Sequence, residues 1–287
     1  TFTDQTVVVN DGVYVSTDFG VWLDVVTGNV SYCRTDSEAP INAIYYRGNG
    51  VPLANSTISW PAVEQLIQAG QADHTWIEPV ITVASNGFPF IAMTDRDESG
   101  QEPDYHVYYI MSDSGNGTWN TPVNGWPSDY CDEDGHTSRF ISLTPLNDGN
   151  ISEIHAEYEG HGVLSAWGLY ANRISGGTGA IICGKGNVQE GGPGMFGLNY
   201  AQVAVGNDTH VVYCEGNVTS LWDTYHDYTG NCTVWEGNLT RLINNDPVLC
   251  TMGWCSQSAN QLVASFMRLH LDLLDGNVPD SWAELFG

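Results

Sequence analysis

The chain has 287 residues, of which 34 are acidic and 8 basic, giving a formal net charge of −26, and its only lysine is Lys185. Such a surface repels phosphate backbones and anionic lipid headgroups, which argues against nucleic-acid and membrane-surface binding. A hydrophobic content of 42% allows a sizeable core, the 32 glycines and 14 tyrosines favour short strands joined by turns, and no run of about 18 apolar residues supplies a transmembrane helix.

The strongest pattern along the chain is an internal repeat. Gly28–Asp36 aligns without a gap with Gly87–Asp95, and glycine, threonine and aspartate coincide. Each copy continues with a Tyr-Tyr pair, a Gly-Asn-Gly segment and a tryptophan. In the first copy these are Tyr45, Tyr46, 48–50 and Trp60. In the second copy they are Tyr108, Tyr109, 115–117 and Trp119. Three weaker copies begin at His136, Tyr200 and Pro247. The period of about 50 to 65 residues is typical of propeller blades.

Alternating apolar residues predict four strands in the second copy, over Trp76–Ala84, Phe88–Thr94, His106–Met111 and Thr118–Val123. The sequence therefore predicts an all-β fold, a β-propeller of four-stranded antiparallel blades forming a single domain over 1–287. We expect five repeat units, at about 17–70, 71–127, 133–187, 192–238 and 241–287. A sixth blade stays open if the pair Thr6–Val9 and Val13–Thr17 does not close the ring.

Two short segments carry helix signals. Residues 61–69 begin with Pro61, a residue favoured in the first turn, and are followed by Gly70, which favours a stop, so an inserted helix is expected there. Asp280–Glu284 has a capping pattern that indicates a last short helix.

The second copy resembles the BNR/Asp-box repeats of sialidase-like propellers over residues 73–127. The resemblance is carried by Pro79, Gly87, Pro89, Ile91, Tyr108, Tyr109, Asp113, Gly115, Thr118 and Trp119. One extra residue separates Gly115 from the Thr-Trp pair, and the Arg-Ile-Pro signature of sialidases is absent. Because that family includes sialidases, polysaccharide lyases and lectins, the resemblance implies contact with carbohydrate but no single reaction.

In an up-and-down blade, the loop entering strand one and the loop between strands two and three lie at the same end. His74 and His136 occupy matching positions in two entering loops. The strand two–three loops supply mostly acidic residues, namely Asp36, Glu38, Asp95, Arg96, Asp97, Glu102, Glu157, Glu159 and His161. We expect these residues to ring one mouth of the central channel, where propeller ligands usually bind.

These residues suggest several chemical roles. His74 and His136 are candidate general bases or metal ligands. The resemblance to BNR-type lyases implies Tyr105 or Tyr158 as the acid that protonates the leaving group. Asp95 and Glu157 form a candidate glycosidase pair, and the candidate ligand-binding residues are Arg96, Glu159, His161 and Asp36. Alternatively, the histidines brace neighbouring blades and the acidic loops are only solvated.

Calcium is the one cofactor that the sequence suggests. Asp95, Asp97 and Ser99, followed by Gly100, read like the first half of an oxygen-rich calcium loop. The usual distal glutamate is missing, because His106 stands in its place. A plain turn is the alternative.

Cysteines and glycosylation sequons favour an oxidising compartment. Of the seven cysteines, we expect local bridges between Cys250 and Cys255, Cys214 and Cys232, and Cys131 and Cys183, with Cys33 left over, although sequence does not fix the connectivity. The eight sequons begin at Asn29, Asn55, Asn116, Asn150, Asn207, Asn217, Asn231 and Asn238. A chain that starts at Thr1 fits removal of a signal peptide, or simple trimming.

Three classes of function follow. The first is a secreted, extracellular or cell-surface glycoprotein that binds or processes a glycan or polysaccharide at the channel mouth. The second is a structural or adhesive subunit that binds copies of itself in an extracellular or virion assembly. The third is some other propeller enzyme, such as a hydrolase that uses the acidic mouth. No nucleic acid or membrane insertion is expected in any of them.

Overall fold

The computed structural model describes residues 18–24, 26–36, 42–54, 57–71, 74–97, 104–112, 119, 136–159, 167–189, 200–215, 222–230, 235, 240–246, 249–258, 261–270 and 282–286. Two compact units divide the chain: unit 1 is Thr1–Glu133 with Gly176–Ala180, and unit 2 is Asp134–Ser175 with Ile181–Gly287. Within the described residues every regular element is a β-strand, and the strands pair antiparallel. No described helix is long and apolar enough to cross a membrane.

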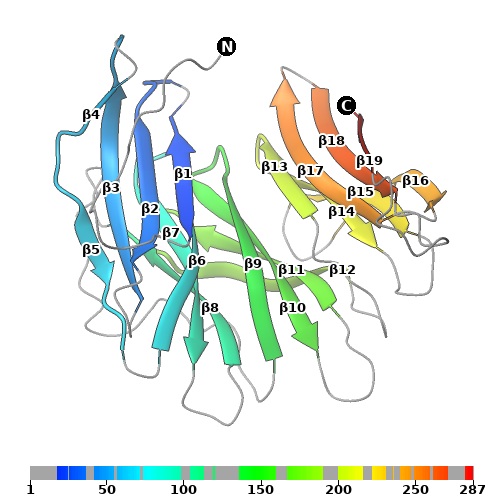
Figure 1. Cartoon of the computed structure of the whole chain (residues 1–287), viewed down its shortest axis with the longest axis horizontal. Coiled ribbons are helices and arrows are strands. Elements are labelled where there is room, and N and C mark those ends of the chain that lie inside the picture. Colours follow the sequence, from blue (N-terminus) through cyan, green and yellow to red (C-terminus); the bar gives the residue numbers. More distant parts are fainter. Residues whose placement is uncertain are drawn as a thin grey trace. The chain divides into compact units, whose positions relative to one another are not determined.

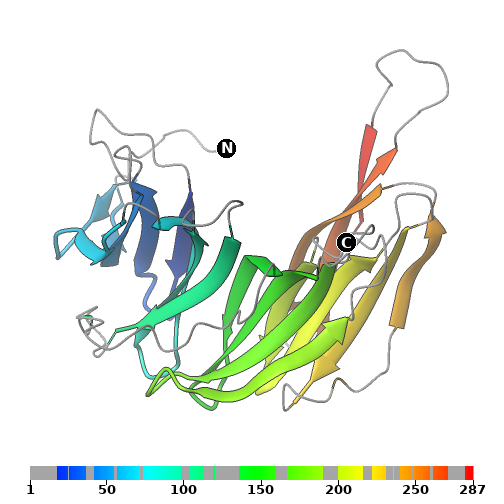
Figure 2. The same cartoon turned by 90° about the horizontal axis from the view of Figure 1, so that it is seen from below.

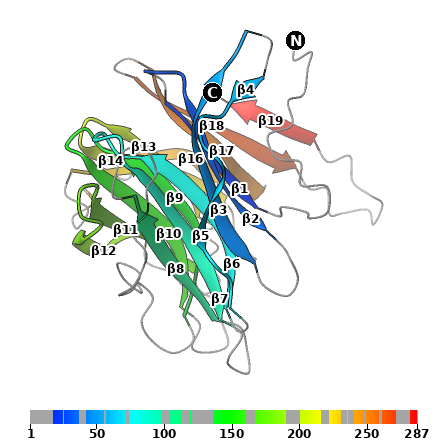
Figure 3. The same cartoon turned by 90° about the vertical axis from the view of Figure 1, so that its left-hand side faces the viewer.

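Unit 1 holds two groups of paired strands, each called a sheet here (Figure 1). The first contains β1 (Phe19–Leu23), β2 (Val30–Asp36), β3 (Ala43–Pro52), β4 (Ile58–Ser59) and β5 (Gln65–Gln68). The second contains β6 (His74–Val83), β7 (Pro89–Asp97) and β8 (Asp104–Met111). Figure 3 shows the blue strands β1 to β3 side by side, with β5 along the other edge of β3. A core of buried Cys33, Ile44, Ile91 and Met93 joins the two sheets.

Unit 2 holds three further groups of strands. The third sheet contains β9 (His136–Pro145), β10 (Asn150–Glu159), β11 (Trp167–Ser175) and β12 (Ile181–Gln189), which are the adjacent green strands of Figure 2. The fourth contains β13 (Tyr200–Val205), β14 (Asp208–Glu215), β15 (Trp222–Thr229) and β16 (Thr240–Asp246). The fifth contains β17 (Leu249–Ser258), β18 (Gln261–His270) and β19 (Trp282–Phe286). Ile154, Leu169 and Val211 lie in the core between the third and fourth sheets.

The chain is therefore an all-β protein of the β-propeller class, in which the sheets follow one another along the sequence. The fold class predicted from the sequence is confirmed. The described strands also refine the repeat boundaries, because β16 pairs with β15 and so extends the fourth unit beyond the expected end at 238. The N-terminal pair Thr6–Val9 and Val13–Thr17 lies outside the described residues.

The first two sheets have equivalent registers. Cys33 pairs with Tyr46 in the first sheet, and Ala92 pairs with Tyr109 at the matching place in the second. Trp119, at the end of the second copy, forms an isolated antiparallel bridge with Ser112. The repeat read from 28–60 and 87–119 is thus a repeat in the strand pairing as well.

A left-handed glycine ends the first hairpin turn in each of the first four sheets. These glycines are Gly28, Gly87, Gly149 and Gly206, with φ of 75°, 83°, 88° and 68°. Glycine adopts this region without the steric cost that a Cβ brings. The same turn residue therefore starts the second strand of each sheet.

A β-bulge recurs at one position in the second and third sheets. Glu78 and Phe140 each lie four residues after the first residue of their strand and have φ of 54° and 58°. Each lies where the register of its strand slips against the next, between Ile77 and Val80 in β6 and opposite His155 in β9. The shared bulge makes His74 and His136, the first residues of these strands, structurally equivalent.

Both expected helices are wrong. The segment 61–69 contains the strand β5, which pairs with β3, and no helix. The free edge of β3 needs backbone partners, and a proline followed later by a glycine can bracket a strand as well as a helix. Residues Trp282–Phe286 form β19, which pairs with β18, in place of the expected C-terminal helix.

Candidate functional site

A histidine and a buried carboxylate meet at one end of the second sheet. His74 is the first residue of β6, and Asp95 lies near the end of β7. The Nδ1 atom of His74 lies 2.8 Å from Oδ2 of Asp95. Asp95 is 2% exposed, whereas the side chain of His74 is 35% exposed. The pair therefore joins a protected carboxylate to a ring that solvent can reach.

The surroundings of Asp95 raise the pKa of its carboxyl group above the ordinary value. Burial raises the pKa of Asp95, and the negative charge of Asp97 acts in the same direction. The hydrogen bond and charge of His74, and the charge of His106, lower it in part. Within the described residues Oδ1 of Asp95 is buried without a hydrogen-bond partner.

This pair has the geometry of a general base and its positioning group. A carboxylate that accepts from Nδ1–H fixes the tautomer and leaves Nε2 as the proton acceptor. The separation of 2.8 Å is within the range required for such a hydrogen bond. His74 therefore stays a candidate general base.

Strand alternation divides the candidates of the second sheet between two faces. Register partners point to the same face, and neighbours along a strand to opposite faces. Asp95 pairs with His106 and with Trp76, and His74 pairs with Asp97, so one face carries all of these residues. Arg96 and Tyr105 pair with each other on the other face. The structure thus separates Tyr105 from the His74–Asp95 pair.

Asp36, the matching residue of the first sheet, belongs to a buried ion network. Its carboxylate lies 3.2 Å from a guanidinium nitrogen of Arg34. Arg34 also donates to both carboxylate oxygens of Glu64, each at 2.8 Å, and Tyr32 donates to Glu64 at 2.8 Å. The hydrogen bonds to Glu64, together with the charges of Glu64 and Asp36, hold the pKa of Arg34 above its usual value. Sequence analysis did not single out Arg34 or Glu64, because 30 residues separate them.

Glu157 lies in β10 as part of a second buried cluster. Its carboxylate is 3.8 Å from Nε2 of His155, while Nδ1 of His155 is 2.9 Å from Glu153. Asn172 donates to Glu153 at 2.6 Å. Sequence analysis did not single out His155 and Glu153, although the Glu-x-His-x-Glu spacing places all three on one face of a strand.

His136 is the first residue of β9 and pairs in register with Glu159, as His74 does with Asp97. Tyr158 lies in β10. His161, Glu38 and Glu102 lie outside the described residues. The predicted ring at the channel mouth joins residues of both units and stays a prediction.

The calcium expectation remains open. Asp95 and Asp97 are strand residues of β7, and Ser99 lies outside the described residues. The described part of the chain contains no group of three or more His, Cys, Asp or Glu side chains arranged to hold a metal ion.

One expected disulfide conflicts with the structure. Cys250 and Cys255 were expected to flank a turn, yet both lie within β17. Five residues of extended strand span roughly 16 Å, well beyond the roughly 7 Å that a disulfide can bridge between Cα atoms. Cys183 in β12 is disulfide-bonded, but Cys131 and Cys232 lie outside the described residues. The pairings of Cys131 with Cys183 and Cys214 with Cys232 therefore stay predictions.

Cys33 is free and fully buried in β2, and burial raises the pKa of its thiol to about 12. It is therefore a packing residue and not a reactive thiol.

Three of the expected glycosylation sites can be placed. Asn29, Asn150 and Asn207 each directly follow a left-handed turn glycine. Asparagine is favoured in such turns for backbone reasons, so at these positions hairpin geometry also explains the asparagine. Asn55, Asn116, Asn217, Asn231 and Asn238 lie outside the described residues.

Fold and site together define a β-propeller-class chain with a histidine–carboxylate pair at a sheet end. No family model matches the chain, so the BNR/Asp-box likeness stays a resemblance. No curated protein matches it either.

Solved structures similar to this chain include a protein of unknown function from Dyadobacter fermentans, with 7% identity and a TM-score of 0.51 over 90% of this chain and 76% of that one. An alpha-L-arabinofuranosidase from Lactobacillus brevis has 11% identity and a TM-score of 0.48, over 96% and 91% of the two chains. An endo-arabinase from Bacteroides thetaiotaomicron has 12% identity and a TM-score of 0.46, over 96% and 94%. At such identities the likeness concerns the fold alone.

Proposed function

We propose that this protein binds or processes carbohydrate, with His74 as its proton acceptor and Asp95 as the residue that positions His74. The observation that carries the proposal is the 2.8 Å contact between His74 Nδ1 and Asp95 Oδ2, which joins a partly exposed imidazole to a buried carboxylate. In a lyase such a histidine removes a proton from a sugar carbon, and in a hydrolase it activates water.

The charge of the protein narrows the class of substrate. A net charge of −26 disfavours polyanions such as nucleic acids. Neutral polysaccharides are free of this repulsion, and a hydroxyl-rich substrate offers many donors to the carboxylates around His74. We therefore expect neutral glycans to bind better than uronic-acid polymers, which favours water activation over proton removal, because the latter needs the acidic carbon proton of a uronic acid.

A polysaccharide screen with matched variants tests the role of His74. We expect His74→Gln to lower kcat by roughly 10²- to 10⁴-fold, the usual contribution of a general base. Asp95→Asn should leave KM nearly unchanged, lower kcat less severely and move the acidic limb of the pH profile. His210→Gln, the same change in β14 of the fourth sheet, is the control and should keep full activity. Wild-type activity in His74→Gln would refute the assignment.

Three further measurements separate the remaining alternatives. Activity measured with and without EDTA tests the proposed calcium site at Asp95, Asp97 and Ser99. A glycan array without any binding, together with a stable self-assembled particle, would instead favour the structural or adhesive subunit. An extracellular glycoprotein should lose mass on enzymatic deglycosylation after expression in a secreting host.

A further inference from the structure

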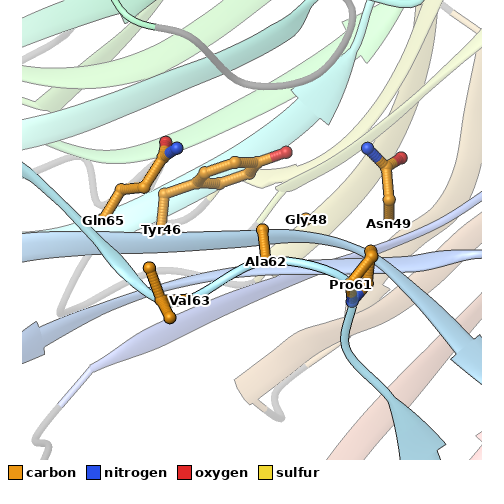
Figure 4. Close-up of a pocket in the computed structure, with 7 residues that line it drawn as sticks. All are labelled: Tyr46, Gly48, Asn49, Pro61, Ala62, Val63 and Gln65. Atoms are coloured by element: carbon orange, nitrogen blue, oxygen red, sulfur yellow. The ribbon is translucent and has the colours of Figure 1, made fainter.

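A pocket lies in unit 1, and neither His74 nor Asp95 lines it. It has a volume of about 340 Å³ and lies between β3 and the segment that leads into β5. Tyr46, Gly48 and Asn49 of β3 line one side, and Pro61, Val63 and Gln65 line the other. In Figure 4 the side chains of Gln65, Tyr46 and Asn49 lie on the same side of β3. Asn49, Pro61 and Val63 are exposed, so the pocket opens to solvent.

Tyr46 forms a fixed wall of this pocket. Its side chain is 2% exposed, its hydroxyl bonds Ser31, and its ring packs edge-on against Trp119 with centroids 5.1 Å apart. A Cβ at Gly48 would lie only 1.9 Å from the Tyr46 hydroxyl oxygen. Only glycine at position 48 therefore lets the phenol occupy this place.

Gln65 supplies a hydrogen-bond acceptor to which no donor is bonded. Within the described residues its Oε1 atom is buried and has no hydrogen-bond partner. A buried carbonyl oxygen without a partner is costly. Because Gln65 as a whole is only half-buried, a rotation of its amide can bring Oε1 to the pocket surface, where a ligand hydroxyl that donates to it removes that cost.

The remaining chemistry of the pocket indicates the ligand. All of its lining side chains are uncharged on a protein with a net charge of −26. An aromatic ring and aliphatic groups lie beside amide groups, which suits a molecule with an apolar face and a rim of hydroxyls. Its volume is at the lower end of the roughly 300–1,000 Å³ typical of ligand pockets, so the ligand is small.

We propose that this pocket binds a single neutral sugar ring, with one ring hydroxyl donating to Gln65 Oε1. The site is separate from the chemistry at His74 and holds even if that assignment fails. If the protein acts on a polysaccharide, this pocket holds the polysaccharide on the protein. If the protein has no catalytic activity, this pocket is its sugar-binding site.

Saturation-transfer NMR with the methyl glycosides of glucose, galactose, xylose and arabinose tests the proposal on the full chain. We expect transfer to the ring protons of at least one of them, and none to glycerol. Gln65→Leu should weaken binding about three- to tenfold, as expected for one lost hydrogen bond. Gln68→Leu makes the same change in the same strand outside the pocket and should bind like the wild type.

Further variants distinguish a lost contact in the pocket from unfolding of the chain. Gln65→Asn withdraws the acceptor by one methylene with little change in polarity, and should weaken binding even where Gln65→Leu unfolds the chain. His74→Gln should leave binding at this pocket intact. The proposal is overturned by an absence of transfer from all four glycosides, or by binding that survives both changes at Gln65.

Discussion

At the scale of single residues, His155 of β10 is the most strongly perturbed base in the described part of unit 2. Burial by itself lowers the pKa of His155, but the charge and hydrogen bond of Glu153 and the interaction with Glu157 outweigh it and raise the pKa to about 9. The ring also stacks on Tyr170, with centroids 6.2 Å apart. In the folded state His155 therefore keeps its proton to a higher pH than a free histidine does.

This shift predicts a pH-dependent stability. Because the folded pKa lies above the ordinary value of 6.5, the stabilisation is fully present below that value and is lost as pH rises through about 9. We expect the free energy of unfolding of the wild type, relative to His155→Gln, to fall by on the order of 3 kcal/mol between about pH 6 and about pH 10. Urea denaturation across this range measures it. Glu153→Gln should shrink the effect, and a pH-independent difference would contradict the assignment.

The residues of the candidate site also show which contacts could be predicted from the sequence and which could not. The meeting of His74 with a carboxylate follows from the meander, because the start of β6 and the end of β7 share one end of the sheet. Tyr105 was expected beside them, but it is adjacent in sequence to His106 and so points to the other face. The pocket at Gln65 depends on how the segment after Trp60 folds back on β3, which no local pattern encodes.

At the scale of elements, the left-handed glycine of the first hairpin turn is the feature that the first four sheets share. Nothing lies within 4 Å of a Cβ built at Gly87, so the φ of 83° is the only reason for glycine there. Gly87→Val should therefore cost roughly 1–2 kcal/mol of unfolding free energy, the penalty of a left-handed conformation. Gly87→Asn should cost less, because asparagine tolerates this region. Denaturant unfolding of the two variants measures the difference, and equal losses would point to a steric cause instead.

Elements were predictable where a turn glycine precedes an apolar segment of strand length. Gly87 with the apolar segment after it predicted β7 nearly correctly. The segment after Pro61 was misread, because Val63, Leu66 and Ile67 also fit helical spacing. The partner that decides between the two is the edge of β3, and sheet edges depend on the tertiary fold.

At the scale of the whole molecule, the net charge of −26 works against compactness. Raising NaCl from about 0.01 M to about 1 M shortens the screening length from about 30 to about 3 Å. We therefore expect the thermal midpoint to rise by several degrees with salt at neutral pH. The same titration near the isoelectric point of about 4.2 is the control, because little net charge remains there to screen. A midpoint that is insensitive to salt or falls at neutral pH would contradict this expectation.

The consecutive order of the sheets has a consequence for folding during synthesis on the ribosome. In every sheet the paired strands are neighbours or near neighbours along the chain, so each closes through short loops at small entropic cost. A ribosome that releases the chain from its first residue onward delivers the strands of one sheet before those of the next. Each hairpin turn can therefore form before distant segments have been synthesised, and the strands of an early sheet can form their backbone hydrogen bonds with one another as they emerge.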